Sequence, residues 1–220
     1  MSHLRSWLEG NEPLVGDASV WINLAATGRM ETVVRSTSRR FLITQTALSE
    51  LEKGRGKGRL TVEAIAPLIS SSLIELVELA PDHEETFISL VAGTASETLD
   101  DGEAATLAYA HGAKAIALID ERKATSIARR RFPELAVVST TELLMAPELR
   151  SRFTSDEFAD VLFGAFSVAR MRVPDHLLEE VCTLLRGERL SHCPSIPARL
   201  RSAFFTKELT SIMGIPGGTI

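Results

Sequence analysis

The amino-acid sequence predicts an α/β fold in which a parallel β-sheet carries helices on both faces and is followed by a C-terminal helical hairpin. Between residues 14 and 138, short apolar runs alternate with segments whose apolar residues recur at helical spacing, which is typical of a parallel sheet. Residues 115–119 form an apolar run without polar alternation, as expected for a strand buried on both faces. From Thr154 onward only helical spacing continues, so the sheet is predicted to end before this residue.

The first half of the chain contains three predicted strands, each with helical sequence after it. Leu14–Gly16 is the first strand, and Ser19 is expected to cap a helix that ends at Gly28. Residues 41–43 form the second strand, and Thr44 or Thr46 caps the helix that follows. The other predicted elements are helices at 30–36, 47–53 and 61–71, a flexible basic loop at 53–59, a strand at 73–79, and a helix through Val91 with a capping box of Asp82 and Glu85.

The second half centres on residues 98–131. Asp100 or Asp101 caps a helix and places Glu103 in its first turn, where negative charge is favoured. After a stop at Gly112, the strand at 115–119 leads directly into Asp120 and then into a basic helix. A strand is predicted at 136–138, followed by a helix from Thr140 that Pro147 bounds. The first hairpin helix runs from the Thr154/Glu157 capping box to about Met171, and the second, at 175–186, is opened by Pro174 and ended by Gly187. A last helix is predicted at 198–209.

Length and composition predict one α/β domain at residues 1–150, a helical hairpin at 151–187, and an extension at 188–220 to which no role is assigned. We find no signal peptide and no apolar run of about 18 residues, so no membrane association is expected. Two isolated cysteines suit a reducing cytoplasm. The net charge of −5 argues against a protein that coats nucleic acid with a basic surface. It leaves open a nuclease that gathers carboxylates at one site.

Four acidic residues occupy equivalent places in this pattern. Asp17 and Asp120 end strands, whereas Glu50 and Glu103 lie in the first turns of helices. All four are therefore expected at the carboxyl edge of the sheet, where repulsion would raise their pKa values or require a cation. Oxygen ligands without histidine or cysteine suit Mg²⁺ or Mn²⁺, which points to phosphodiester hydrolysis. Taken singly, Asp17 is explained as a helix cap, and Glu50 and Glu103 as ordinary helix residues.

The ordered set of motifs resembles the PIN-domain nucleases. The resemblance rests on the segment DAS at 17–19 followed by WINL at 21–24, the helix with Glu50, and the segments LDDGEAATLAYAHGAK and LIDERKA, and it covers roughly residues 13 to 185. It is strongest to a prokaryotic branch with D-[TA]-S and L-x-x-G-E motifs. In that branch a helical hairpin often follows, and residues 169–181 are similar to it.

This resemblance implies a three-layer α/β/α fold and a metal-dependent endoribonuclease, commonly the toxin of a toxin–antitoxin pair. It implies an RNA substrate, an antitoxin protein as partner, and a homodimer. By position, the catalytic metal ligands would be Asp17, Glu50, Glu103 and Asp120, with Asp101 sharing the role of Glu103. Ser19 would form a hydrogen bond within the site. Arg122 and Lys123, beside Asp120, are our candidates for contacts to the substrate phosphate.

Other basic and aromatic residues have simpler explanations. The loop at 53–59 suits a solvated turn, and Arg129, Arg130 and Arg131 are favoured at a helix C-terminus without any RNA. Trp21 is interpreted as core or dimer packing rather than as a platform for bases. The same interpretation covers Phe153, Phe158, Phe163 and Phe166.

Two alternative functions are considered. The first is a phosphatase or a phospho-acceptor receiver, both of which place aspartates at strand ends. The phosphatase needs a second aspartate two residues after the first, but Ser19 occupies that position. The receiver needs a lysine at the end of a late strand, and residues 138–140 contain none. A PIN-like module that has lost catalysis and only binds nucleic acid or a partner is disfavoured by the presence of all four acids. Metal-dependent cleavage of RNA would separate the nuclease from both alternatives.

Overall fold

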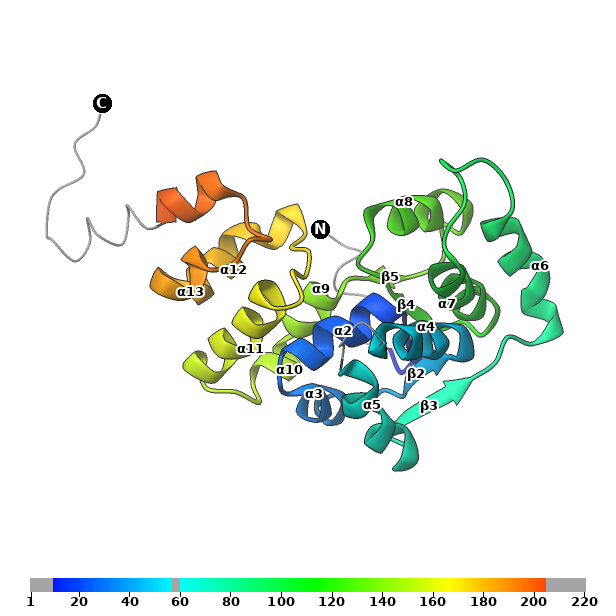
Figure 1. The fold of residues 1–220 in the computed structure, drawn as a ribbon, viewed down its shortest axis with the longest axis horizontal. Helices are drawn as coiled ribbons and strands as arrows, with labels where there is room; N and C mark the ends of the chain where they lie inside the picture. The colour runs from blue at the N-terminus through cyan, green and yellow to red at the C-terminus, as the bar shows by residue number, and fades with distance from the viewer. Residues whose placement is uncertain (1–9, 57–59, 205–220) are drawn as a thin grey trace, which may run out of the picture.

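A computed structural model describes residues 10–56 and 60–204 (Figure 1). In these residues the sheet has five strands, and every neighbouring pair is parallel. The strands are β1 (Leu14–Gly16), β2 (Phe41–Thr44), β3 (Ile74–Val77), β4 (Ile116–Leu118) and β5 (Val137–Val138), in the spatial order β3-β2-β1-β4-β5. The chain therefore builds outward from β1 to β3 and then returns to the other side of β1. No helix in the described ranges is long and apolar enough to cross a membrane.

Each central strand contributes to two hydrophobic cores, because successive side chains point to opposite faces of the sheet. Leu14 of β1 and Ile116 of β4 pack into one core, whereas their neighbours Val15 and Ala117 pack into the other. The first core is covered by α2 (Ala18–Ala26), α3 (Met30–Ser36), α4 (Gln45–Arg55), α5 (Thr61–Ser70), α9 (Thr140–Leu144) and α10 (Pro147–Arg150). The second is covered by α6 (Pro81–Val91), α7 (Asp101–Gly112) and α8 (Arg122–Arg131). The predicted α/β fold with helices on both faces is confirmed.

The C-terminal helices extend the first core and lie at the end of the molecule away from α6 (Figure 1). They are α11 (Ser155–Ser167), a 3₁₀ turn η1 (Asp175–Leu177), α12 (Leu178–Leu185) and α13 (Gly187–Ser191), and residues 198–204 are helical as well. The predicted hairpin is present, although α11 ends at Ser167 rather than near Met171. Gly187 begins α13 instead of ending a helix, because Arg186 adopts a φ of 45° and reverses the chain before it. The rest of the helix predicted at 198–209 lies outside the described residues.

Several helix caps differ from the sequence prediction. Asp17, not Ser19, caps α2, and the α6 cap is Ala80, whose amide donates to His83, rather than Asp82 with Glu85. Of the paired candidates, Thr44 caps α4, and Asp100 caps α7. Helix α4 continues to Arg55, so the first part of the predicted loop at 53–59 is helical, and residues 57–59 lie outside the described chain.

The aromatic side chains are structural. Trp21 is fully buried, where it contacts Phe41 edge to face and donates from its indole Nε1 to the carbonyl oxygen of Gly16 at 3.0 Å. Phe158 and Phe166 of α11 are buried in the same core. These rings belong to the core, in agreement with the sequence interpretation, and are not available to stack on bases.

Helix α11 approaches α2 closely because residue 164 is a glycine. A Cβ at Gly164 would collide with the main-chain carbonyl of Ala26, the last residue of α2. Since the obstacle is backbone rather than a flexible side chain, a larger residue would push the two helices apart.

We predict that Gly164→Ala lowers the free energy of unfolding by about 1–2 kcal/mol, because overpacking outweighs the roughly 1 kcal/mol that alanine gains in a helix. Chemical denaturation followed by circular dichroism would measure the change. Gly56→Ala is the matched control, since a Cβ there meets only the Lys53 carbonyl oxygen at 3.7 Å. Equal stabilities of the two variants would contradict the close approach.

Candidate active site

A cavity of about 470 Å³ opens at the carboxyl edge of the sheet, beside the adjacent strands β1 and β4. The direction of strand addition reverses between these two strands, and in open α/β sheets such a reversal creates a crevice beyond the strand ends. Asp17 directly follows β1, and Asp120 follows β4 by two residues. Both residues line the cavity, so the two strand-end acids share one opening. We call it the acidic cavity.

Asp17 links the cavity to the start of α2. Its Oδ2 accepts hydrogen bonds from the Ser19 amide at 3.2 Å and from the Ser19 hydroxyl at 2.8 Å. Burial raises the pKa of Asp17, the hydrogen bonds from Ser19 lower it, and the negative charge of Asp100 raises it further. Asp17 is thus both a helix cap and a buried acid of the cavity, so the two interpretations of this residue are compatible.

Glu50 enters the cavity from the second turn of α4, not from a first turn as predicted, because α4 already begins at Gln45. Its Oε1 accepts a hydrogen bond from the Gly102 amide at 2.9 Å, which connects α4 to the first turn of α7. A Cβ at Gly102 would collide with the Glu50 carboxylate, so the glycine next to Glu103 leaves room for the second acid. Burial, together with the charges of Asp100 and Asp17, raises the pKa of Glu50 to about 7.

Helix α7 contributes two acids at its N-terminus. Asp100 caps the helix and accepts a hydrogen bond from the Glu103 amide at 2.9 Å. Glu103 is only 7% exposed. Burial raises the pKa of Glu103 to about 8, with further contributions from the charges of Asp100 and Asp17. Both residues line the cavity.

The acids that influence one another are not quite the set proposed from the sequence. After burial, the charges of Asp100 and Asp17 contribute most to the raised pKa values of Glu50 and Glu103. Asp101 is exposed and does not line the cavity, although its charge also raises the pKa of Glu50. We define the acidic cluster as Asp17, Glu50, Asp100 and Glu103.

The Asp120 carboxylate is the acceptor in a separate hydrogen-bond network. Its Oδ2 accepts from Asn23 Nδ2 at 2.6 Å and from the Thr140 hydroxyl at 2.5 Å, and its Oδ1 accepts from the Thr140 amide at 2.8 Å. Burial raises the pKa of Asp120, while these hydrogen bonds and the charge of Arg172 lower it. Among the hydrogen bonds of the described residues, Oδ1 accepts only one, so a lone pair remains for a ligand.

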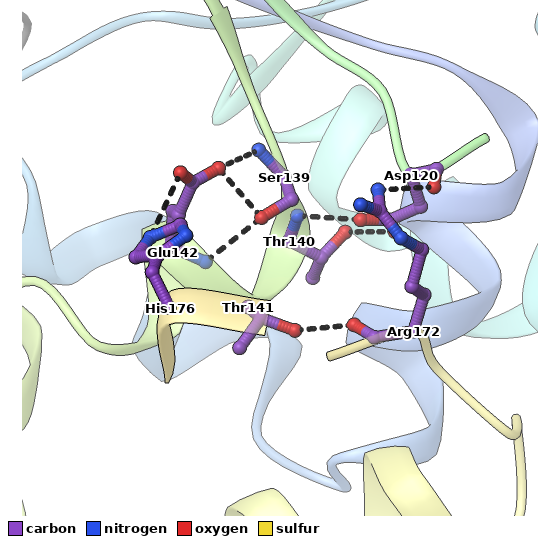
Figure 2. Close-up of polar contacts among 7 residues, drawn as sticks. All are labelled: Asp120, Ser139, Thr140, Thr141, Glu142, Arg172 and His176. Atoms are coloured by element: carbon purple, nitrogen blue, oxygen red, sulfur yellow. Dashed lines mark hydrogen bonds and ion pairs between the residues drawn. The ribbon is translucent and has the colours of Figure 1, made fainter. Parts of the chain in front are cut away.

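Arg172 supplies positive charge beside Asp120. Figure 2 shows its side chain lying against Asp120, where Nη1 donates to the Asp120 main-chain carbonyl at 3.3 Å. The Arg172 carbonyl in turn accepts from the Thr141 hydroxyl at 2.6 Å. Arg172 lines the acidic cavity but lies 52 residues after Asp120, in the irregular segment between α11 and η1. No periodic pattern marks such a segment, so the sequence alone does not identify this arginine.

The residues suggested for phosphate binding lie elsewhere. Ser19 lines the acidic cavity and binds Asp17, but neither Arg122 nor Lys123 lines it. The Lys123 ammonium donates to the Ala95 carbonyl at 2.6 Å, and Nη2 of Arg122 lies 3.8 Å from Oδ1 of Asp175. Both residues belong to the first turn of α8, which Glu121 caps.

The four members of the acidic cluster form no ion pair within residues 10–56 and 60–204, although Arg170 and Arg172 line the same cavity. The raised pKa values of Asp17, Glu50 and Glu103 show that the site favours protons or another cation. The oxygen atoms of the four acids suit a hard divalent ion. In the described chain no three acidic, histidine or cysteine side chains are close enough to hold an ion as they stand. Binding would therefore require the carboxylates to move toward the ion.

Comparison with known proteins agrees with this geometry. A family model described as a PIN domain matches residues 13–186, which is most of the chain. No curated protein and no solved structure matches the chain significantly.

We predict that, in a chelating buffer, the free energy of unfolding contains a contribution from Glu50 and Glu103 that falls as pH rises. Their folded pKa values of about 7 and about 8 lie above the usual value of 4.5, so the folded state binds more protons than the unfolded state between about pH 4.5 and 8. Stability is therefore lost through this window. Urea denaturation at pH 5, 6, 7 and 8 would measure it.

Glu103→Gln isolates the effect. The variant should match the wild type near pH 5 and become progressively more stable than the wild type toward pH 8, because glutamine has no proton to lose. Glu52→Gln, at an exposed position of α4, is the control. A stability difference between Glu103→Gln and the wild type that does not change with pH would contradict charge repulsion in the cavity.

Proposed function

The chain belongs to the PIN-domain family, whose members are generally nucleases, and we propose that it is a metal-dependent endoribonuclease that hydrolyses phosphodiester bonds in RNA. The observation that carries this proposal is the set of acids on one cavity at the reversal point of the sheet, without an ion-pair partner among the described residues. A metal-dependent nuclease needs such a site, because a cation must bring phosphate and carboxylates together against their mutual repulsion.

We propose Mg²⁺ or Mn²⁺ as the cation. Asp17, Glu50 and Glu103 would hold it, and Asp120 would add its free lone pair. The cavity also favours Asp100 over Asp101 as the additional acid, since Asp100 lines the cavity and Asp101 does not. When bound, the ion would polarise a phosphoryl oxygen and make a water molecule more acidic.

Without an ion, the carboxylates of the cavity are protonated in part and are oriented by backbone amides. Glu103, with a pKa of about 8, is mostly protonated at neutral pH, and Glu50, with a pKa of about 7, is about half protonated. An ion that binds these carboxylates must displace those protons, so metal affinity should increase with pH. The amides of Ser19 and Gly102 orient Asp17 and Glu50, and this fixes the acceptor atoms that face the cavity.

The partner proposals rest on the motif resemblance. We propose that the protein is the toxin of a toxin–antitoxin pair, that a small antitoxin protein neutralises it, and that it forms a homodimer. Arrest of bacterial growth on expression, relieved by a product of a neighbouring reading frame, would support the pair. Sedimentation at several protein concentrations would test the dimer.

We predict that Asp17→Asn reduces metal-dependent cleavage of single-stranded RNA by at least about a hundredfold, since loss of one ligand removes several kcal/mol of stabilisation of the transition state. The fold should survive, because asparagine caps helices about as well as aspartate. Cleavage of labelled RNA titrated with Mg²⁺ or Mn²⁺, and of the matching DNA, is the measurement. Asp82→Asn, exposed at the start of α6, is the matched control. Full activity of Asp17→Asn would reject the site.

Asp120→Asn is a less specific test of the site, because it is expected to change stability as well as activity. Asp17 and Asp120 are equivalent by sequence pattern, but both oxygens of Asp120 accept buried hydrogen bonds. An amide NH₂ in place of one oxygen would oppose the donors of Asn23 or Thr140, so destabilisation of about 1–3 kcal/mol is expected in addition to any loss of activity.

We predict that Gly102→Ala lowers cleavage with little change in the melting temperature. The new methyl group would displace the Glu50 carboxylate, which is the end of a flexible side chain, rather than any backbone. Glu50→Gln should reproduce the loss of cleavage if displacement of this acid is the cause. A Gly102→Ala protein as active as the wild type would show that the position of Glu50 is unimportant.

A further inference from the structure

A second cavity, of about 460 Å³, lies between α8 and the segment that leads into η1. Its lining contains four arginines: Arg122, Arg129 and Arg130 of α8, and Arg172. We call it the basic cavity. It is not part of the site derived above, although Arg172 lines both cavities and so connects them.

The helical repeat explains why arginines gather here. Arg122, Ser126 and Arg129 are spaced by four and three residues, which places them along one face of α8. Arg131, at the end of the same helix, behaves differently, because its guanidinium donates to the Ser89 carbonyl and hydroxyl at 2.8 Å. Attraction to the helix C-terminus would act alike on Arg129, Arg130 and Arg131, which all lie in the last turn. It does not explain why Arg129 and Arg130 line a cavity.

Two acids, Glu142 and Asp175, also line the basic cavity. Glu142 accepts hydrogen bonds from the Ser139 amide and hydroxyl, both at 2.7 Å, and lies 3.4 Å from His176. Asp175 is 86% exposed and lies 3.8 Å from Arg122, so this pair is weak. Within the described chain, neither Arg129 nor Arg130 forms an ion pair. The basic cavity therefore keeps a net positive charge.

Arg172 lies where the acidic and basic cavities meet, and the segment that carries it is anchored by two contacts. Figure 2 shows the segment around it anchored by the bond from Thr141 to its carbonyl and by the contact of His176 with Glu142. Its Nη1 binds the Asp120 carbonyl, whereas its buried Nε has no hydrogen-bond partner within the described chain. A buried donor without a partner is costly. Arg172 therefore keeps hydrogen-bonding capacity that the rest of the described chain does not use.

We propose that the basic cavity binds a backbone phosphate of the RNA strand adjacent to the phosphate that is cleaved. The proposal rests on the nuclease function above. With the scissile phosphate at the acidic cavity, a neighbouring phosphate reaches the arginines of α8, and Arg172 lies between the two. Guanidinium groups suit this task because their planar donors bind phosphate oxygens in pairs. The arrangement also draws a polyanion to a chain whose net charge is −5.

The test compares Arg129→Ala, Arg130→Ala and Arg131→Ala. Each removes one positive charge from the last turns of α8, but Arg131 does not line the basic cavity. Fluorescence anisotropy with a labelled single-stranded RNA of about ten nucleotides, in EDTA, measures binding without cleavage. We expect the first two variants to bind about tenfold more weakly, with a salt dependence reduced by about 0.7 for each phosphate that the variant no longer neutralises. Arg131→Ala should bind as the wild type does.

Cleavage supplies the second measurement. With Mg²⁺ or Mn²⁺, Arg129→Ala and Arg130→Ala should raise KM for the long RNA and leave cleavage of a dinucleotide with a single phosphate unchanged. Equal weakening by all three variants, or no weakening by the first two, would overturn the proposal. If the wild type binds RNA but cuts none, the nuclease function fails and the anisotropy comparison still decides the basic cavity. If the wild type binds no RNA in EDTA, the proposal for the basic cavity fails, and the metal-titrated cleavage assay decides the nuclease function separately.

Discussion

Repulsion among carboxylates at the carboxyl edge of the sheet is the constraint to which the surrounding structure responds. Asp17, Glu50 and Glu103 are brought together by the topology, since β1 and β4 are neighbours and α4 and α7 begin at the same edge. Burial is the largest cause of the raised pKa values of the two glutamates, and repulsion from Asp100 and Asp17 adds to it. Such a site costs folding free energy unless protons or a divalent ion compensate the charge.

The fold offsets part of this cost with backbone dipoles rather than with ion pairs. Asp17 and Asp100 are the N-caps of α2 and α7, so the positive ends of both helices face the acids. The Gly102 amide serves Glu50 in the same way. Backbone amides cannot move away or be neutralised, so they orient the carboxylates without filling the cavity as a lysine or arginine would. The space and the negative charge both remain available to a cation.

Much of the fold and part of the site could be predicted from the sequence, because both rest on local patterns. A buried apolar run followed by an acid and a helix identifies Asp17 and Asp120 without any long-range information. The caps are less predictable. Asp100 and Asp101 are equally good cap residues, and only the packing of α7 decides that Asp100 turns into the cavity. Arg172 could not be found at all, since its place depends on how the segment after α11 folds back onto Asp120.

The position of Arg172 also alters what the C-terminal helices contribute. A hairpin that only extended the core would be connected to the helices around the sheet by apolar contacts, such as those of Phe158 and Phe166. Here the segment between α11 and η1 also forms a wall of both cavities, and Thr141 and Glu142 of α9 hold it there. Acidic and basic sites that share one wall cannot shift independently. The distance between a bound ion and a neighbouring phosphate would therefore be set by the packing of the hairpin, and substitutions in that packing should change how RNA binds before they change the acids themselves.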